Sequence, residues 1–336
     1  MSWESFCGLL VAGGLLAVPA PVTAQAERGV PRRPVSTYSI VARDSATGEL
    51  GVAVQSHWFS VGAIVPWAES GVGAIATQSF VEPSYGPLGL ALMRTGRTAP
   101  EALRGLVAAD PHPEVRQVGM VDGGGRVAVH TGELAIAEAC DRTGDGFTVE
   151  ANLMKNPTVC DAMFEAYTTA GGDLAARLMA ALHAAQREGG DIRGRQSAAL
   201  LVVRAEPSGR PWEDRIFDLR VEDDSSPLAE LDRLLNVARA YRHMNAGDEF
   251  VTRGEIDRAL EEYARAEGLL PERSEPIFWH AVTLVSVGRV EESLPLFRRA
   301  FEMRSDWRLL VPRLVEAELL PDDPAVVQRI VKLGEP

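Results

Sequence analysis

The sequence contains little cysteine, no long apolar run and no excess of basic charge, and each shortage excludes a class of protein. Three cysteines occur among 336 residues, and none has the neighbours of a metal-binding cluster. The apolar residues 8–19 are fewer than the roughly 20 needed to span a membrane. With a net charge of −13, the chain lacks the clustered basic residues that bind nucleic acid. We therefore expect no nucleic-acid partner and no membrane insertion.

Metal-binding spacings are also missing. His57 and His130 occur without an HExxH or Cys-x-x-Cys motif, so we assign no metal ligands. The glycines at 123–125 lie between two predicted strands rather than before a helix, which indicates a turn and not a phosphate-binding loop. The sequence thus predicts no metal and no cofactor.

The N-terminus has the order of a signal peptide. An apolar run is followed by small residues, and cleavage after Ala24 or Ala26 fits that pattern. Lys and Arg are absent from the first residues, which is unusual for such a segment. We expect residues 1–26 to direct export to the periplasm or the outside, and residues 27–36 to remain as a propeptide or linker. Cys140 and Cys160 would then either pair or stay unpaired.

The rest of the composition is that of a globular protein with two domains. Hydrophobic residues make up 46% and charged residues 24% of the chain. A length of 336 residues exceeds that of one ordinary domain. We place a first domain at residues 37–221, a linker at 222–227 and a second domain at 228–336.

The first domain is predicted to be α+β. Residues 37–42 and 50–55 are apolar and β-branched and are separated by a turn, so they form a hairpin that brings Gln55, Ser56 and His57 beside Thr37. Helical periodicity marks residues 85–95, 99–109, 158–170 and 173–187. Further strands are predicted at residues 61–66, 72–77, 115–121, 126–131, 197–204 and 215–221. Strands that arrive as hairpins favour antiparallel sheets with helices outside.

The second domain is predicted to consist of helical repeats. Gly254, Ala259, Leu260, Tyr263 and Ala266 recur 34 residues later as Gly288, Ser293, Leu294, Phe297 and Ala300. This spacing is the period of tetratricopeptide helix pairs, and the flanking helices would act as caps. A plain bundle of helical hairpins is the alternative. The repeats would offer a surface to a protein partner.

Separate short motifs follow one another between residues 37 and 221. Residues 37–44 read Thr-Tyr-Ser-Ile-Val-Ala-Arg-Asp, and residues 48–54 read Gly-Glu-Leu-Gly-Val-Ala-Val. Others lie at residues 65–68, 71–74, 76–78, 84–87, 116–119, 131–132, 151–154 and 189–199. In this order they resemble the domain-of-unknown-function family numbered 1028. The resemblance implies the fold of N-terminal-nucleophile (Ntn) hydrolases, a four-layer αββα sandwich.

The resemblance implies that Thr37 is a nucleophile. Ntn hydrolases attack an amide with the side chain of the first mature residue, and the α-amine of that residue acts as the base. An α-amine has a pKa of about 7.7–8.0, so a substantial fraction is neutral near pH 7. Here a second cut, between Ser36 and Thr37, would be required. Otherwise Thr37 only begins a strand, and the hydroxyls of Ser36 and Ser39 are weaker alternatives.

An acyl-transfer site also needs donors for an oxyanion. The candidates lie at predicted strand ends and loops, and each could instead satisfy a local hydrogen bond; they are Asn152, Gln78, Gln196, Ser197, Ser56 and His57. Asp191 and Arg193 are expected to form a structural charge pair in the loop before residue 197. Asp44 is expected to shape the first turn, away from Thr37.

Three functions are compatible with these features. The first is an exported amidohydrolase that acts on a small amide or peptide-like substrate and docks a protein through residues 228–336. The second is a non-catalytic binding protein in which Thr37 is never freed. The third is a scaffold that forms a homodimer through apolar side chains such as Trp58, Phe59 and Trp67.

Overall fold

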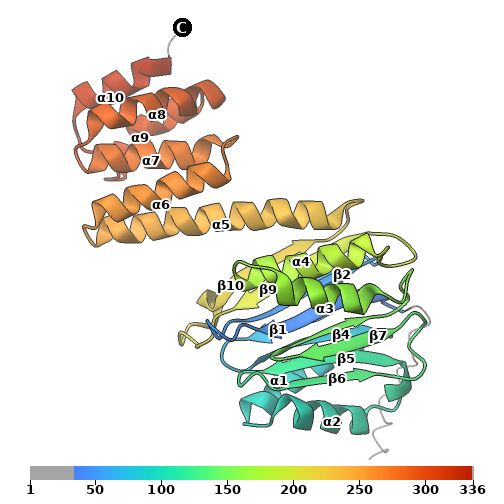
Figure 1. Ribbon diagram of the computed structural model, residues 1–336. Helices are drawn as coiled ribbons and strands as arrows, with labels where there is room; N and C mark the ends of the chain where they lie inside the picture. The colour runs from blue at the N-terminus through green and yellow to red at the C-terminus, as the bar shows by residue number, and fades with distance from the viewer. Residues whose placement is uncertain (1–33, 335–336) are drawn as a thin grey trace, which may run out of the picture.

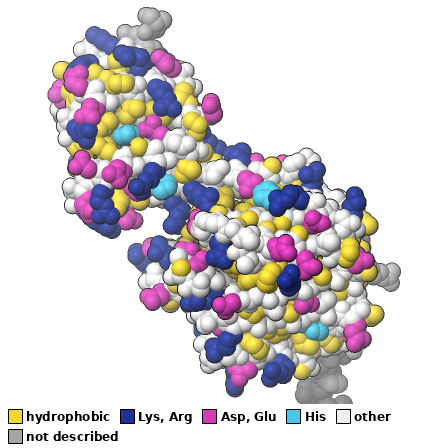
Figure 2. Space-filling view, in the orientation of Figure 1, with side chains coloured by type: hydrophobic (Ala, Val, Ile, Leu, Met, Phe, Trp, Pro, Cys, Tyr) yellow, Lys and Arg dark blue, Asp and Glu magenta, His cyan; other side chains and the backbone are white. Residues whose placement is uncertain are grey.

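The computed structural model describes residues 34–334, so the expected signal peptide, residues 1–26, lies outside the described residues, as do residues 27–33. An α+β part with two antiparallel sheets is followed by a helical part (Figure 1). In the space-filling view the two parts are lobes joined at a narrower waist (Figure 2). None of the helices within residues 34–334 is long and apolar enough to cross a membrane.

The larger sheet has six strands in the order β10-β9-β2-β1-β8-β7, and all neighbours are antiparallel. Its strands are β1 (Thr37–Arg43), β2 (Leu50–Ser56), β7 (Cys140–Gly144), β8 (Phe147–Ala151), β9 (Ser197–Val203) and β10 (Arg215–Val221). The smaller sheet has the order β3-β4-β5-β6 and is also antiparallel. Its strands are β3 (Pro66–Glu69), β4 (Gly73–Ser79), β5 (Arg116–Asp122) and β6 (Val127–Thr131).

The two sheets face each other, and helices cover their outer faces (Figure 1). Helices α3 (Val159–Thr169) and α4 (Leu174–Arg187) pack on the six-stranded sheet. Helices α1 (Tyr85–Arg94) and α2 (Ala99–Ala109) pack on the four-stranded sheet. The predicted combination of antiparallel sheets with external helices is thus confirmed.

The β1–β2 hairpin has the predicted turn. The Asp44 carboxylate accepts hydrogen bonds from the backbone N–H groups of Ala46 at 2.8 Å and Thr47 at 2.9 Å. Gly48 has a φ of 76°, which a residue without a side chain adopts at low cost. The turn sets the register that places Thr37 opposite Ser56.

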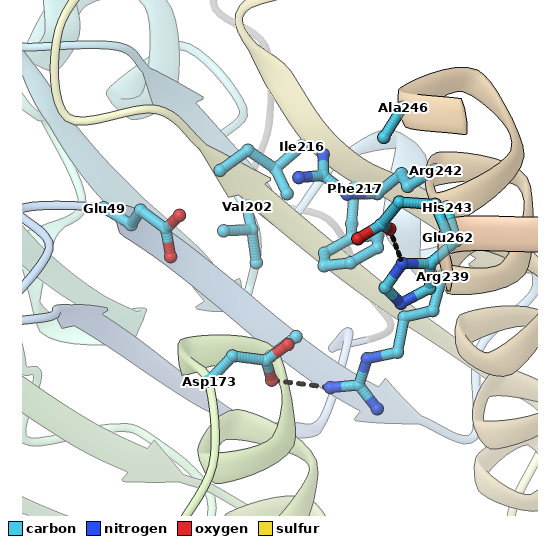
Figure 3. A pocket seen from close by; sticks show the side chains of 11 residues that line it. Glu49, Asp173, Val202, Ile216, Phe217, Arg239, Arg242, His243, Ala246 and Glu262 are labelled. Carbon is cyan, nitrogen blue, oxygen red and sulfur yellow. Dashed lines mark hydrogen bonds and ion pairs between the residues drawn. The ribbon is translucent and has the colours of Figure 1, made fainter. Parts of the chain in front are cut away.

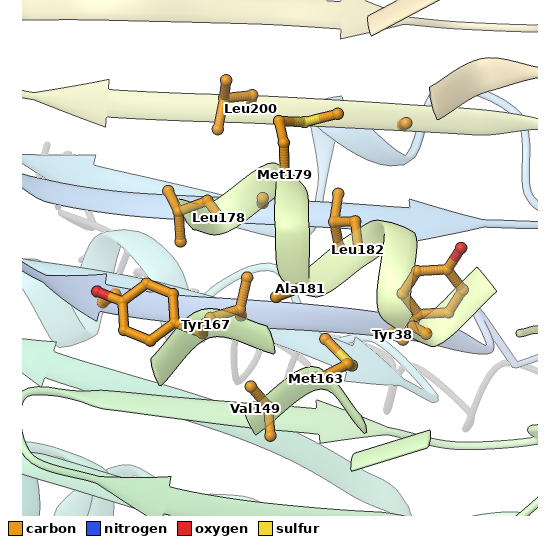
Figure 4. Packing of buried hydrophobic residues seen from close by; sticks show 14 of the residues in the cluster. Tyr38, Val149, Met163, Tyr167, Leu178, Met179, Ala181, Leu182 and Leu200 are labelled. Carbon is orange, nitrogen blue, oxygen red and sulfur yellow. The ribbon is translucent and has the colours of Figure 1, made fainter. Parts of the chain in front are cut away.

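Alternation along the strands divides the buried side chains between two faces. Tyr38, Ile40 and Ala42 point toward α3 and α4, where Met163, Leu178 and Leu182 pack against the sheet (Figure 4). Val41, Val52 and Val54 point toward the other sheet, where they join Ala74, Ala76 and Val121. The space between the sheets is apolar at this end and becomes polar toward Thr37.

Helix α5 (Pro227–Thr252) belongs to both lobes. Leu228, Leu231 and Leu235 lie in the same buried cluster as the outer face of the six-stranded sheet and α4. The C-terminal half of α5 instead packs against α6 (Ile256–Leu269). The segment 222–227, which we expected to separate two domains, therefore leads into a helix that both lobes share.

The helical lobe continues with α7 (Ser274–Ser286), α8 (Val290–Met303), α9 (Trp307–Glu316) and α10 (Pro324–Val331). Gly254 and Gly288, with φ of 76° and 81°, follow α5 and α7. The residue pairs that recur after 34 positions occupy matching buried places in α6 and α8: Ala259 with Ser293, Tyr263 with Phe297, and Ala266 with Ala300.

Three features differ from the expectations or resolve them. Residues 61–66, predicted as a strand, form a 3-10 turn (Val61–Ala63), and β3 begins only at Pro66. Strands β7 and β8 were not predicted, because a short polar strand and one with a central glutamate lack a clear apolar alternation. Cys140 in β7 and Cys160 in α3 form a disulfide, which settles the open choice between pairing and free thiols.

Candidate functional site

Thr37 lies at the start of β1 with its side chain between the two sheets. It is fully buried, and its hydroxyl donates to the carbonyl oxygen of Val35 at 2.7 Å. The same oxygen lies 3.3 Å from the hydroxyl oxygen of Ser56, its partner across the hairpin. The Thr37 carbonyl accepts from the backbone N–H of Asn152 at 3.0 Å. The predicted neighbourhood of Thr37 and Ser56 is thus observed.

The chain before Thr37 crosses from one sheet to the other. Val35 and Ser79, the last residue of β4, exchange two backbone hydrogen bonds of 2.6 and 3.1 Å. Two residues later the chain enters β1 of the other sheet. The peptide bond between Ser36 and Thr37 is therefore buried between the sheets, and the Thr37 nitrogen belongs to that bond.

The carbonyl oxygen of Ser36 has two hydrogen-bond donors. The Ser56 hydroxyl donates to it at 2.5 Å, and Nη2 of Arg193 donates at 2.9 Å. Nη1 of Arg193 donates to the carbonyl of Pro34 at 3.3 Å. Two donors, one of them charged, on a single carbonyl oxygen form the arrangement that stabilises negative charge on that oxygen during acyl transfer.

Asp191 holds Arg193 in place. Its buried carboxylate accepts from Nε of Arg193 at 3.1 Å and from Nη2 at 2.8 Å. It also accepts from the backbone N–H of His57 at 3.0 Å, which fixes the chain just after Ser56. The predicted charge pair is present. Its contact with Ser36 was not predicted, because 157 positions separate Arg193 from that residue.

A buried polar network continues from Thr37 between the sheets. Nε2 of Gln78 donates to Oε1 of Gln117 at 2.8 Å and lies 3.4 Å from the Thr37 carbonyl. Nδ2 of Asn152 donates to the same Gln117 oxygen at 2.9 Å. The Ser39 hydroxyl joins Oε1 of Gln78 at 2.7 Å to the carboxyl of Glu150 at 3.4 Å. Complete burial raises the pKa of Glu150 well above its usual value.

The remaining predicted residues lie near the site with other contacts. The Ser197 hydroxyl donates to the Trp58 carbonyl and accepts from the Val61 N–H, so it anchors the loop after β2. The Gln196 amide points outward to Asp223, although its backbone N–H donates to the Ser56 carbonyl at 3.2 Å. The structure thus brings Thr37, Ser56, Gln78 and Asn152 together and directs the side chains of Gln196 and Ser197 elsewhere.

Unpartnered polar atoms concentrate around this point. Among the described residues, the buried side-chain atoms without a hydrogen-bond partner are those of Ser36, Gln55, His57, Ser79 and Asn152, together with Nε of Arg43. Ser36 precedes Thr37, Gln55 and His57 flank Ser56, and Ser79 pairs with Val35. Each such group costs about 1–3 kcal/mol of stability, and groups of this kind call for an explanation. Their clustering marks the start of β1 as a functional site.

A separate cavity of about 430 Å³ lies where α5 meets the six-stranded sheet (Figure 3). Arg239 pairs there with Asp173, and His243 pairs with Glu262. No Ser, Thr or Cys lines this cavity, so it lacks a nucleophile for acyl transfer. Within residues 34–334, no group of three or more His, Cys, Asp or Glu side chains could hold a metal ion.

The aromatic residues of the scaffold hypothesis are placed differently from one another. Trp58 and Trp67 are partly buried and pack against the apolar clusters of the two sheets. Phe59, next to Trp58, is 63% exposed. Only Phe59 of the three is thus free to offer a large apolar surface.

Comparison with known proteins adds a family to this geometry. Residues 37–231 match the model of a family of unknown function, DUF1028. The crystal structure of protein SPO2555 from Silicibacter pomeroyi, assigned to the same family model, is 27% identical with a TM-score of 0.53; the match covers 60% of this chain and 88% of that one. No curated protein matches the chain. The matched residues include all ten strands and the start of α5.

Proposed function

The chain belongs to the DUF1028 family, and on that premise we propose that it is an exported amidohydrolase of the Ntn type, with Thr37 as nucleophile. The observation behind this proposal is the Ser36 carbonyl, whose oxygen lies between the Ser56 hydroxyl and the Arg193 guanidinium directly before the Thr37 hydroxyl. The order of layers, helices, sheet, sheet and helices, supports the four-layer αββα sandwich of that superfamily. The disulfide supports export to an oxidising compartment.

The same geometry supports self-cleavage of the bond before Thr37. The Thr37 oxygen attacks the Ser36 carbonyl carbon, and the oxyanion is held by Ser56 and Arg193. The bond from that carbon to the Thr37 nitrogen breaks, and the hydroxyl proton passes to this nitrogen. Water then hydrolyses the resulting ester, which leaves a Ser36 carboxylate, a Thr37 hydroxyl and a free α-amine. This amine is the base that the mature enzyme needs.

The helical lobe is proposed to be a tetratricopeptide-like module that docks a protein partner. The equivalent buried positions in α6 and α8 and the glycines after α5 and α7 support this assignment. A cavity of about 600 Å³ opens between helices α5 and α7, with Tyr241, Met244 and Trp279 in its wall. An apolar wall with polar groups at its edges suits a peptide-like segment of a partner.

A binding protein without catalysis is the second candidate. It is favoured by the intact, buried segment 34–36, whose backbone is held at both ends by Ser79 and Arg193. In that case Thr37 never acquires a free amine, and the helical lobe carries the function alone.

Intact mass and N-terminal sequencing of the exported, folded protein decide between the two. We expect a chain that begins at Thr37. The variant Thr37→Val should fold but remain uncut, since it keeps the shape of threonine and lacks the hydroxyl. Thr37→Ser should still be cut. A folded wild-type chain that keeps residues 27–36 indefinitely would favour the binding protein instead.

A further inference from the structure

Residues 34–36 contact the site as a bound peptide does. Val35 forms a pair of backbone hydrogen bonds with Ser79, on the side of β4 that β3 leaves unpaired at this end. Peptides that add to a sheet gain affinity from such main-chain bonds and specificity from the pockets of their side chains. The segment therefore shows how an extended acyl group can lie before the cleaved bond.

The two side chains before the cleaved bond occupy pockets of different character. The Val35 side chain is 1% exposed and belongs to the apolar cluster that includes Val61, Val65 and Ala76. The Ser36 side chain is fully buried, and its hydroxyl has no partner among the described residues. The first pocket thus fits a β-branched apolar group, and the second fits a small group whose polarity gains nothing.

Arg193 recognises the backbone of the segment. Its guanidinium donates to the carbonyl oxygens of Ser36 and Pro34, which precede the cleaved bond by one and three residues. A substrate needs two peptide carbonyls at this spacing to satisfy both donors. A simple amide with a short acyl group provides only one.

We infer that the substrate is an extended peptide cleaved after a small residue that follows a β-branched apolar residue. This inference rests on the proposed function and adds the substrate class. The Thr37 oxygen bonds to the carbonyl carbon of the small residue, and the substrate nitrogen leaves as an amine with the proton taken up by the Thr37 α-amine. Water then hydrolyses the ester and releases a peptide carboxylate.

Binding of product-like peptides tests this inference apart from catalysis. The protein is prepared with Thr37 as its first residue, from a fusion cut at that point. Residues 37–336 keep every strand and helix, and only the bridge made by Val35 is lost. Calorimetry then compares acetyl-Pro-Val-Ser-amide with peptides that carry Ala for Ser, Phe for Ser or Asp for Val.

We expect the Ala peptide to bind at least as tightly as the Ser peptide, because burial of an unpaired hydroxyl is costly. The Phe and Asp peptides should bind at least about tenfold more weakly, since neither a large ring nor an unpaired charge suits a closed pocket. Uncut Thr37→Val protein is the matched control and should not bind, because residues 34–36 fill its site. Equal binding of all four peptides, binding to the uncut protein, or no binding at millimolar peptide would overturn the inference.

Hydrolysis measured in the same samples separates this inference from the proposed function. Selective peptide binding without cleavage of acetyl-Pro-Val-Ser-Thr-amide overturns the enzyme proposal and supports the peptide site. Cleavage of simple amides with no preference for the peptide leaves the enzyme proposal standing and overturns the peptide site.

Discussion

The hydroxyl of Ser56 donates to the carbonyl oxygen of Ser36 at 2.5 Å. This contact connects the end of the first hairpin to the peptide bond that precedes Thr37, and Arg193 donates to the same oxygen from a loop on the opposite side of β9. A carbonyl with two such donors is polarised before any reaction begins. The predictions below test what these donors and their supports contribute.

Replacing Ser56 by alanine should slow cleavage before Thr37. Loss of one oxyanion donor lowers the rate of acyl transfer by about 10²–10³-fold in enzymes where it has been measured. Mass spectrometry of the purified precursor over time gives the rate. Ser70→Ala is the matched control, because its hydroxyl is also largely buried and donates to a carbonyl, that of Arg204 at 2.8 Å, away from the site. Equal slowing in both variants would assign the effect to folding.

Replacing Arg193 by glutamine should affect both stability and cleavage. The Asp191 carboxylate is 0% exposed, and breaking a buried pair typically costs about 3–5 kcal/mol. The double variant Arg193→Gln, Asp191→Asn removes the buried charge and should regain much of this loss in urea unfolding. Cleavage should remain slow in both variants, because neither has the guanidinium on Ser36. Recovery of the cleavage rate in the double variant would show that Arg193 acts only through stability.

The fold was largely predictable, and the reasons why parts were missed are local. The Thr37–Ser56 register followed from the length of a hairpin turn, which is a property of neighbouring residues. Residues 61–66 were misassigned because a short buried turn has the same apolar composition as a buried strand. Strand β8 was missed because Glu150 occupies an inward position, where the network of Ser39 and Thr148 accommodates it.

The site was predictable only in part for a different reason. Family motifs and the hairpin pointed to Thr37, Ser56, Gln78 and Asn152, which the structure brings together. The contact of Arg193 with Ser36 joins residues far apart in sequence, and no local pattern encodes it. Side-chain direction was equally hidden, as the outward amide of Gln196 illustrates.

Glu150 should make stability fall as the pH rises. Burial is the main cause of its raised pKa, so the folded chain holds this proton more tightly than the unfolded chain does. Stability is therefore lost above the unfolded pKa of about 4.3 and up to the raised folded value. Glu150→Gln removes this contribution and should unfold at higher urea than wild type at pH 7. The two proteins should converge near pH 4; a constant difference at every pH would contradict this assignment.

Leu231→Ala should destabilise the α/β lobe although it changes a helix at the boundary of the other lobe. Leu231 is fully buried in the cluster beneath α4, and such truncations cost about 2–5 kcal/mol. Leu309→Ala on α9 is the control, because that side chain is 65% exposed and its loss should change stability by less than about 0.5 kcal/mol. Chemical unfolding of both variants measures the difference. Equal midpoints would show that α5 does not belong to the α/β core.

The contact between Ser36 and Arg193 also orders events in time. Its two residues are 157 positions apart, and the α/β core that supports them includes leucines of α5 that are synthesised later still. During synthesis and translocation the bond before Thr37 therefore has neither of its donors in place. It becomes reactive only after most of the chain has emerged and folded, so a chain that starts at Thr37 would be a record that its own folding had been completed.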